Sequence, residues 1–394
     1  MKNRIKRLRE MLGTRELPCD IWLLLAALVL AGIGWVMVGS ASVGLSEDSF
    51  HYAVRHGVFL LVAISAAAVT MSLPLEPWRQ NAGLILFASL ALLLVVLVVG
   101  QDINGSKRWI ALPGPLPSLQ VSEVGKLGLV FYMAAFMSRF AVELRTRAFT
   151  LLRPLMVLAA PLGLLFLAPD FGGMVVYTVC VVGMLMMAGA SLVLLIGAGS
   201  ALGFGAVLLV MLEPYRLARW TSFLDPWADQ FATGYQLTQA LIAFGRGHVT
   251  GTGLGNSVQK LHFLPEAHTD FIFAVIAEEL GMIGAIAVVA LFTLFIVRAM
   301  LIGRRAEVAG HLFAAYMSYG IGFIIAAQAF INMAVSSGLL PTKGLTLPLV
   351  SYGGSSLLVT GVMVGLLLRA DRETRLFPKR TPTPAKRRRQ PRLS

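Results

Sequence analysis

Long apolar stretches without charged side chains are the feature that most constrains how this chain can fold. The stretch from Ile21 to Val38 is one example, and it is long enough to cross a lipid bilayer as a helix. These stretches do not alternate between apolar and polar residues, so they are not strands of a transmembrane barrel. The composition agrees, because 57% of the residues are hydrophobic, 13% are charged and the mean hydropathy is +0.77. The sequence therefore predicts an all-α integral membrane protein.

The hydropathy pattern predicts ten transmembrane helices with both termini in the cytoplasm. Lys and Arg are concentrated at the two ends of the chain, and basic segments favour the cytoplasmic side. Because both ends are basic, the number of spans must be even. A large outer loop then falls between spans seven and eight. The expected spans are residues 21–40, 57–73, 83–99, 124–138, 155–168, 172–190, 192–212, 271–297, 312–333 and 346–368.

The chain divides into three regions. Residues 1–20 are a basic cytoplasmic N-terminus, residues 21–369 are the membrane domain, and residues 370–394 are a basic, Pro-rich tail expected to be disordered. The net charge of +13 is assigned to topology and to attraction by anionic lipids, and nucleic-acid binding is not expected. The outer loops are expected at about residues 100–123, 213–270 and 334–350.

Polar side chains collect in these outer loops. Glu123 and Lys126 are three residues apart, so they share one helix face and could form a local ion pair or contact a ligand. Arg108 and Trp109 place a cation and an indole close to the membrane surface. They could anchor the loop there or contact the head group of a ligand. Asp170 precedes an apolar run and is expected to cap a helix.

The stretch "LPEAHTDFIFAVIAEELG", residues 264–281, places an acidic, histidine-bearing segment directly before an apolar run. Asp270 lies at the outer mouth of a helix expected to begin at Phe271. Thr269 or Asp270 is expected to be the N-cap of this helix, where the helix dipole stabilises it.

Capping does not explain why the chain carries Glu278 and Glu279. They lie about 12 Å beyond Asp270 along a helix that rises ~1.5 Å per residue. Ionisable groups inside a membrane are unfavourable unless they face a polar cavity or a partner. Lys126 or Lys343 is the expected partner of one of them. The helix would then form the wall of a water-filled cavity that suits an anionic, membrane-anchored substrate. The cations expected around this cavity are Arg108, Lys126, Arg216, Arg219 and Lys343.

Two other motif interpretations are weak. The glycines within residues 245–255 resemble a dinucleotide loop only superficially, because no strand precedes them, so we expect a flexible connector. The segment just before them is amphipathic and could form a helix lying on the membrane. A zinc site of His262, Glu266 and His268 matches no strong ligand spacing, so no metal site is predicted.

Four motifs together resemble those of the SEDS family, named for shape, elongation, division and sporulation. They are "GSKRWI", "SEVGK", "FLPEAHTDFIFAVIAEELG" and "GLLPTKGLTLPLVSYGGSS". The resemblance extends from the first span to about Arg369 and is stronger to the division members than to the elongation members. Val121 departs from the pattern, because family members often carry proline there.

The resemblance implies a peptidoglycan glycosyltransferase that polymerises lipid II during septal cell-wall synthesis. It places the essential carboxylate at Asp270, as the general base for the acceptor's 4-hydroxyl, with undecaprenyl pyrophosphate as the leaving group. A divalent cation, Mg²⁺ or Mn²⁺, is a possible cofactor. The resemblance carries over Arg108, Glu123 and Lys126 as cavity residues, and the full set of expected substrate contacts is Arg108, Trp109, Glu123, Lys126, Glu266, His268 and Lys343.

The resemblance also implies partners and a location. A class B penicillin-binding protein, the septal transpeptidase FtsI, would pack against spans eight and nine. Other divisome membrane proteins and membrane lipids are further expected partners. The protein would lie in the cytoplasmic (inner) membrane at the division septum, with its active site facing the periplasm. A flippase for lipid II and a division scaffold without chemistry are the alternatives.

Overall fold

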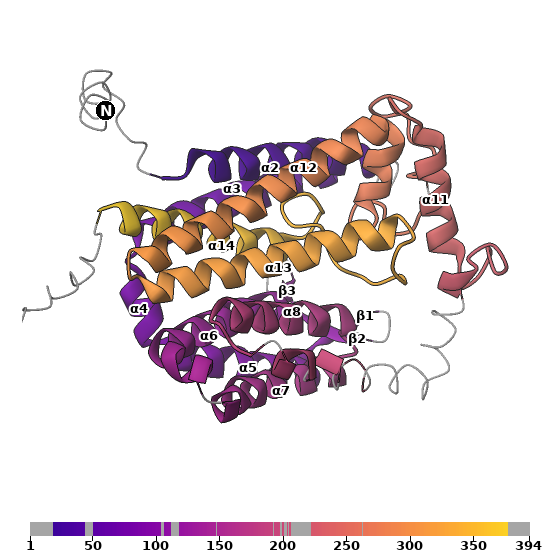
Figure 1. The fold of residues 1–394 in the computed structure, drawn as a ribbon. Coiled ribbons are helices and arrows are strands. Elements are labelled where there is room, and N and C mark those ends of the chain that lie inside the picture. Colours follow the sequence, from indigo (N-terminus) through magenta and orange to yellow (C-terminus); the bar gives the residue numbers. More distant parts are fainter. Residues whose placement is uncertain are drawn as a thin grey trace, which may run out of the picture.

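The computed structural model shows a mainly helical bundle (Figure 1). It describes residues 19–43, 50–103, 106–111, 118–146, 148–191, 193–197, 199–200, 203, 205, 222–261 and 263–376. Eight helices in this part of the chain are long and apolar enough to cross a membrane, so the chain is a multi-pass membrane protein. They are α2 (Ile21–Ala41), α3 (His51–Ser72), α5 (Ala82–Val99), α6 (Val121–Thr146), α7 (Leu152–Leu167, which spans together with the preceding turn from Phe149), α12 (Ile272–Val308), α13 (Leu312–Ser336) and α14 (Gly354–Leu376).

Shorter elements complete the described part. The apolar helix α8 (Phe171–Met187) matches a further expected span, whereas most of the expected span 192–212 lies outside the described residues. The last helix begins at Gly354, so residues 346–353, predicted as its first turns, are instead a non-helical turn. The other short helices are α4 (Leu75–Gln80), the 3₁₀ helix η1 (Ala148–Leu151) and α11 (Tyr235–Gly247).

The described part of the chain also contains a small antiparallel sheet, so the all-α prediction needs correction in this segment. Its strands are β1 (Gln101–Ile103), β2 (Ser106–Ile110) and β3 (Leu119–Gln120), in the order β1-β2-β3. The sheet lies at the end of the bundle that also carries α11, and we call this the sheet end (Figure 1). The strands pair their backbone groups within the segment predicted as an outer loop at about residues 100–123.

At the opposite end of the bundle, ion pairs connect the first described helix, α2, to α12 and to the last described helix, α14. Asp20, which caps α2, forms ion pairs with Arg298 and Arg305 of α12, and Arg305 also pairs with Asp371 of α14. The described part of the chain therefore begins and ends at this end of the bundle.

Helix α13 is the central helix of the bundle. It packs against α12, α6 and α8, and most of its surface is buried. Close approach is possible because glycines face its neighbours. A Cβ at Gly320 would lie 2.7 Å from the sulfur of Met184. Small residues at such contacts are the usual means of packing helices tightly in membranes.

Helix α12 is not one straight helix, because its backbone breaks at Gly281. The φ angle of Gly281 is 68°, and the residues on either side are helical. Residues 272–280 therefore form a short segment, and only the residues after the break form a long spanning helix. Helix α11 packs mainly on α12, so the amphipathic helix that was expected is present and its buried face contacts protein.

Replacing Gly281 with alanine should lower the unfolding temperature of the protein in detergent. A left-handed conformation costs a non-glycine residue about 1–2 kcal/mol. The added Cβ would also lie 2.5 Å from the carbonyl oxygen of Val249. Gly163→Ala is the matched control, because a Cβ at Gly163, within α7, meets nothing within 4 Å. A Gly281→Ala variant as stable as Gly163→Ala would contradict this account of the break.

Candidate functional site

Asp270 lies directly before α12, and its carboxylate is not used to cap the helix. The helix begins at Ile272, and its N-cap is Phe271, which makes no side-chain capping bond. The prediction that Thr269 or Asp270 caps the helix is therefore wrong. The Thr269 hydroxyl instead bonds to the carboxylate of Glu266 at 2.5 Å.

The main chain around Asp270 is fixed by α13 and by the loop before α14. Asn332 donates from its side-chain nitrogen to the carbonyl of Asp270 at 2.8 Å and to that of Leu345 at 2.6 Å. The Ser351 hydroxyl donates to the carbonyl of Thr269 at 2.6 Å. These bonds join segments far apart in sequence, so the position of Asp270 depends on three elements of the fold.

The carboxylate of Asp270 is partly exposed and accepts no hydrogen bond from any residue that the structure describes. It lies beside Gly344, where an added Cβ would be 2.9 Å from Oδ2. Burial and the nearby carboxylate of Glu266 raise the pKa of Asp270 to about 7, although Arg108 opposes the shift. Asp270 therefore exchanges a proton near neutral pH, as a general base must.

Arg108 of β2 is held at the turn between α7 and α8. Its Nε donates to the carbonyl of Ala168 at 3.2 Å, and Nη2 donates to the carbonyl of Pro169. Its Nη1 lies 3.7 Å from Oδ1 of Asp170. Asp170 also accepts from the backbone N–H of Gly173 at 3.0 Å, so its predicted role as a helix cap is confirmed.

Lys343 is a second cation at the N-terminus of α8. Its ammonium group lies 4.9 Å from the ring centre of Phe171, the first residue of α8. The next residue, Gly344, touches the Asp270 carboxylate. Lys343 and Arg108 therefore lie at the same helix N-terminus, whose dipole also favours negative charge. The arrangement places a base beside a site suited to an anion.

Glu123 and Lys126 lie inside the bundle. Lys126 Nζ is 2.6 Å from Glu123 Oε1, and both side chains are buried. Gln328 of α13 donates to the same Glu123 oxygen at 3.3 Å. The local ion pair expected from their spacing is therefore present, and a role in binding substrate stays a prediction.

The other predicted contacts are spread around the sheet end. Trp109 pairs with Gln101 and Gln120 in the sheet and is partly exposed, whereas Glu266 is exposed. His268 packs between aromatic rings, with centroids 5.2 Å from Tyr52 and 5.6 Å from Tyr352. Burial lowers the pKa of His268, which keeps the ring neutral. The predicted Arg216, Arg219 and His262 lie outside the described residues.

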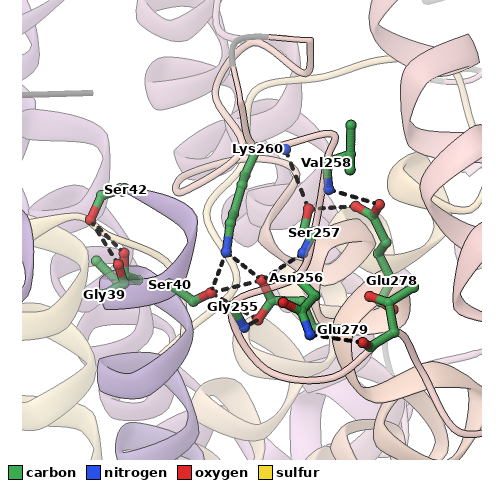
Figure 2. Close-up of polar contacts among 12 residues, drawn as sticks. Gly39, Ser40, Ser42, Gly255, Asn256, Ser257, Val258, Lys260, Glu278 and Glu279 are labelled. Atoms are coloured by element: carbon green, nitrogen blue, oxygen red, sulfur yellow. Dashed lines mark hydrogen bonds and ion pairs between the residues drawn. The ribbon is translucent and has the colours of Figure 1, made fainter. Parts of the chain in front are cut away.

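The expectations for Glu278 and Glu279 are wrong in two respects. Their cationic partners are Arg246, at 3.6 Å from Glu278, and Lys260, at 2.8 Å from Glu279, and neither Lys126 nor Lys343. They do not line a cavity either, because both are fully buried and bonded to the loop after α11 (Figure 2). The glycine-rich part of that loop, predicted to be flexible, is fixed by these bonds.

One cavity in the described part of the chain, of about 290 Å³, is not part of this site. It lies at the opposite end of the bundle, near α4 and the end of α14. Its polar lining residues are Glu76, Arg79, Ser138, His311 and Glu373.

Sequence reasoning missed several residues that shape the site. Asn332 fixes the main chain of Asp270, and it could have been suspected because a polar amide inside an apolar helix needs a partner. Asp170 was treated only as a cap, although it also holds Arg108. The contacts of Gly344 and Ser351 with the Asp270 region could not be predicted from the sequence, although both residues lie in one of the four motifs.

Comparison with known proteins shows the family of this chain. Residues 21–376 match a family model described as "Cell cycle protein", the family of FtsW, RodA and SpoVE. The chain is 57% identical to a probable peptidoglycan glycosyltransferase FtsW of Halomonas elongata, over 96% of each chain. It is 50% identical to a protein of the same description from Nitrosococcus halophilus, over 94% of this chain and 96% of that one.

Two solved structures are also similar. A chain from a study of how a peptidoglycan synthase complex coordinates polymerization and crosslinking matches with a TM-score of 0.75 at 29% identity, covering 90% of this chain and 98% of that one. The rod shape determining protein RodA of Thermus thermophilus matches with a TM-score of 0.67 at 28% identity, covering 91% and 98%.

Replacing Asn332 with leucine should destabilise the protein by on the order of 1–3 kcal/mol, because buried carbonyls lose their donor. The carbonyls are those of Asp270 and Leu345. The measurement is thermal unfolding in detergent. Ser336→Ala is the control on the same helix, because Ser336 bonds only within α13. Equal stability of the two variants would show that the Asn332 bonds are unimportant.

Proposed function

The chain belongs to the cell cycle protein family of FtsW, RodA and SpoVE, and on that premise we propose that it is a peptidoglycan glycosyltransferase that polymerises lipid II. The observation that carries the proposal is the Asp270 carboxylate, whose pKa is raised to about 7 and which is close enough to Arg108 to feel its charge. Arg108 and Lys343 both lie at the N-terminus of α8. A base beside cations fits a reaction whose leaving group is a diphosphate.

Asp270 removes the proton from the acceptor sugar's 4-hydroxyl as that oxygen attacks the anomeric carbon of the donor. The bond from the anomeric carbon to the diphosphate breaks, the configuration inverts, and undecaprenyl pyrophosphate leaves with the bonding electrons. The proton remains on Asp270 until solvent takes it. One carboxylate is enough because a diphosphate leaves without a proton, whereas glycoside hydrolases usually need two carboxylates.

Arg108 and Lys343 stabilise the negative charge that develops on the diphosphate. Both are already held at the N-terminus of α8, so little rearrangement is needed. Contacts of Trp109, Glu266 and His268 with the sugars follow from the family resemblance. A contribution of the buried Glu123–Lys126 pair to substrate binding also follows from the family resemblance.

A divalent cation is assigned no step. Among the residues that the structure describes, no three His, Cys, Asp or Glu side chains converge to form a metal cage. Mg²⁺ or Mn²⁺ as a cofactor remains an expectation from the resemblance, and the described side chains offer no ready-made site for it.

The proposed setting is the cytoplasmic membrane at the division septum, with Asp270 facing the periplasm. A class B penicillin-binding protein, FtsI, would pack against α12 and α13. Support comes from the similar chain studied in a peptidoglycan synthase complex that coordinates polymerization and crosslinking. A lipid II flippase has less support, because Glu278 and Glu279 are bonded to a loop and do not line a path through the bundle.

Asp270→Asn should abolish glycan synthesis, because an amide cannot take the proton from the acceptor hydroxyl. The measurement is polymerisation of purified lipid II by the full chain, alone and with its presumed partner. Asp229→Asn is the control, because Asp229 is a loop carboxylate bonded only to nearby Thr233. Long glycan from Asp270→Asn would remove Asp270 from the mechanism. Movement of lipid II across vesicles without polymerisation by the wild type would favour the flippase.

The rate of polymerisation should rise with pH through about 7, because Asp270 acts only when ionised. Glu266 raises the pKa of Asp270, so Glu266→Gln should shift this rise to lower pH. The shift is measured from the initial polymerisation rates of the wild type and the variant between about pH 5 and 9. Glu143→Gln, at the opposite end of the bundle in α6, should leave the profile unchanged. A shift to higher pH in Glu266→Gln would contradict the assignment.

A further inference from the structure

The loop after α11 inserts into the hydrogen-bond ladder of α12. In a continuous helix, the N–H groups of Met282 and Ile283 would bond four residues back. The break at Gly281 prevents this. Met282 instead donates to the carbonyl of His248 at 3.0 Å, and Ile283 donates to the carbonyl of Val249 at 3.2 Å.

The two carbonyls released by the break are also satisfied by this loop. Thr252 donates from its backbone N–H to the carbonyl of Glu278 at 3.0 Å, and Gly253 donates to that of Glu279 at 3.0 Å. Buried backbone groups without partners would be costly here, so the break and the loop require each other. The loop is therefore part of the structure of α12.

The side chain of Glu279 extends this connection to the first helix (Figure 2). Its oxygens accept from the Ser40 hydroxyl at 2.7 and 2.8 Å, from Lys260 Nζ at 2.8 Å and from the Gly255 N–H at 3.0 Å. Lys260 also donates to Ser40 at 2.9 Å. We call Ser40, Lys260 and Glu279 the Lys260 cluster.

Glu278 binds the same loop on its other side. It accepts from the Ser257 hydroxyl at 2.5 Å and from the Val258 N–H at 3.1 Å, and Arg246 Nε lies 3.6 Å away. The Glu278 and Lys260 side chains are fully or almost fully buried. Loss of one charge would leave an opposite charge buried without its partner, which is the costly case.

The short segment 272–280 connects the Lys260 cluster to Asp270. Nearly all of its side chains are buried, so the segment is packed tightly against its neighbours. Asn332 and Ser351 hold the chain just before it, at Asp270 and Thr269, and the Lys260 cluster holds its other end. Because the helix is broken at Gly281, the direct helical hydrogen bonds from Met282 and Ile283 back to this segment are absent.

We propose that the Lys260 cluster positions the Asp270 carboxylate, with Lys260 and Glu279 as positioning residues that tie the segment 272–280 to α2. This inference rests on the proposed function, in which Asp270 is the base. Through Ser40, the first helix of the bundle contributes to the geometry of the active site.

The chain provides a matched control for this proposal. At the opposite end of the bundle, Arg298 of α12 forms an ion pair with the buried Asp20 that caps α2. It joins the same two helices as the Lys260 cluster. Arg298 lies beyond the break at Gly281 and far along α12, so its loss should weaken the bundle without moving Asp270.

The test compares Lys260→Met with Arg298→Met in the full chain, using thermal unfolding and polymerisation of purified lipid II. We expect kcat to fall about tenfold or more in Lys260→Met, with KM nearly unchanged, since small misplacements of a catalytic group are costly. Its pH profile should also shift. Arg298→Met should lose stability while kcat stays within about twofold of the wild type. Equal kcat values in the two variants would overturn the proposal.

Amide hydrogen exchange provides a readout that does not need activity. Lys260→Met should speed exchange in residues 248–261 and 272–283 and leave the rest of α12 unchanged, whereas Arg298→Met should not affect these segments. Unchanged exchange in Lys260→Met would overturn the positioning role. If the wild type made no glycan while exchange changed as expected, the proposed function would fail and the structural coupling would stand.

Discussion

The break in α12 at Gly281 is the constraint on which the rest of this structure depends. A helix broken at this point leaves two N–H groups and two carbonyls without partners, and residues 248–253 supply all four. The loop can do this only if it folds back onto the bundle. The segment 272–280 then becomes a separate short helix, and Asp270 is brought to the loop before α14 instead of to the mouth of a straight span.

The electrostatics of the site follow from that placement. Burial and, to a lesser extent, the carboxylate of Glu266 raise the pKa of Asp270 to about 7, and Arg108 is close enough to oppose the shift. Arg108 is fixed by three contacts to the turn before α8, and Lys343 lies over the first residue of α8. The carboxylate and the cations are therefore supplied by separate elements that meet only in the folded bundle.

Individual predictions succeeded where the cause was local. The spacing of Glu123 and Lys126 predicted an ion pair within one helix turn, and Asp170 before an apolar run predicted a cap. Predictions failed where the outcome depended on a distant segment. Glu278 and Glu279 were assigned to a cavity because the sequence did not reveal their partners. Arg246 lies on α11, and Lys260 lies in a loop that was expected to be flexible.

The sequence by itself determined the membrane fold, most of its helices and, through its motifs, the family and the acidic residue at its centre. Hydropathy and helical spacing are local properties, so they can be read from neighbouring residues. Only the tertiary structure decided which groups surround Asp270, that α12 is broken, and that Ser40 of the first helix meets Glu279. These outcomes depend on satisfying buried polar groups across hundreds of residues of chain, and that pairing has no local signature.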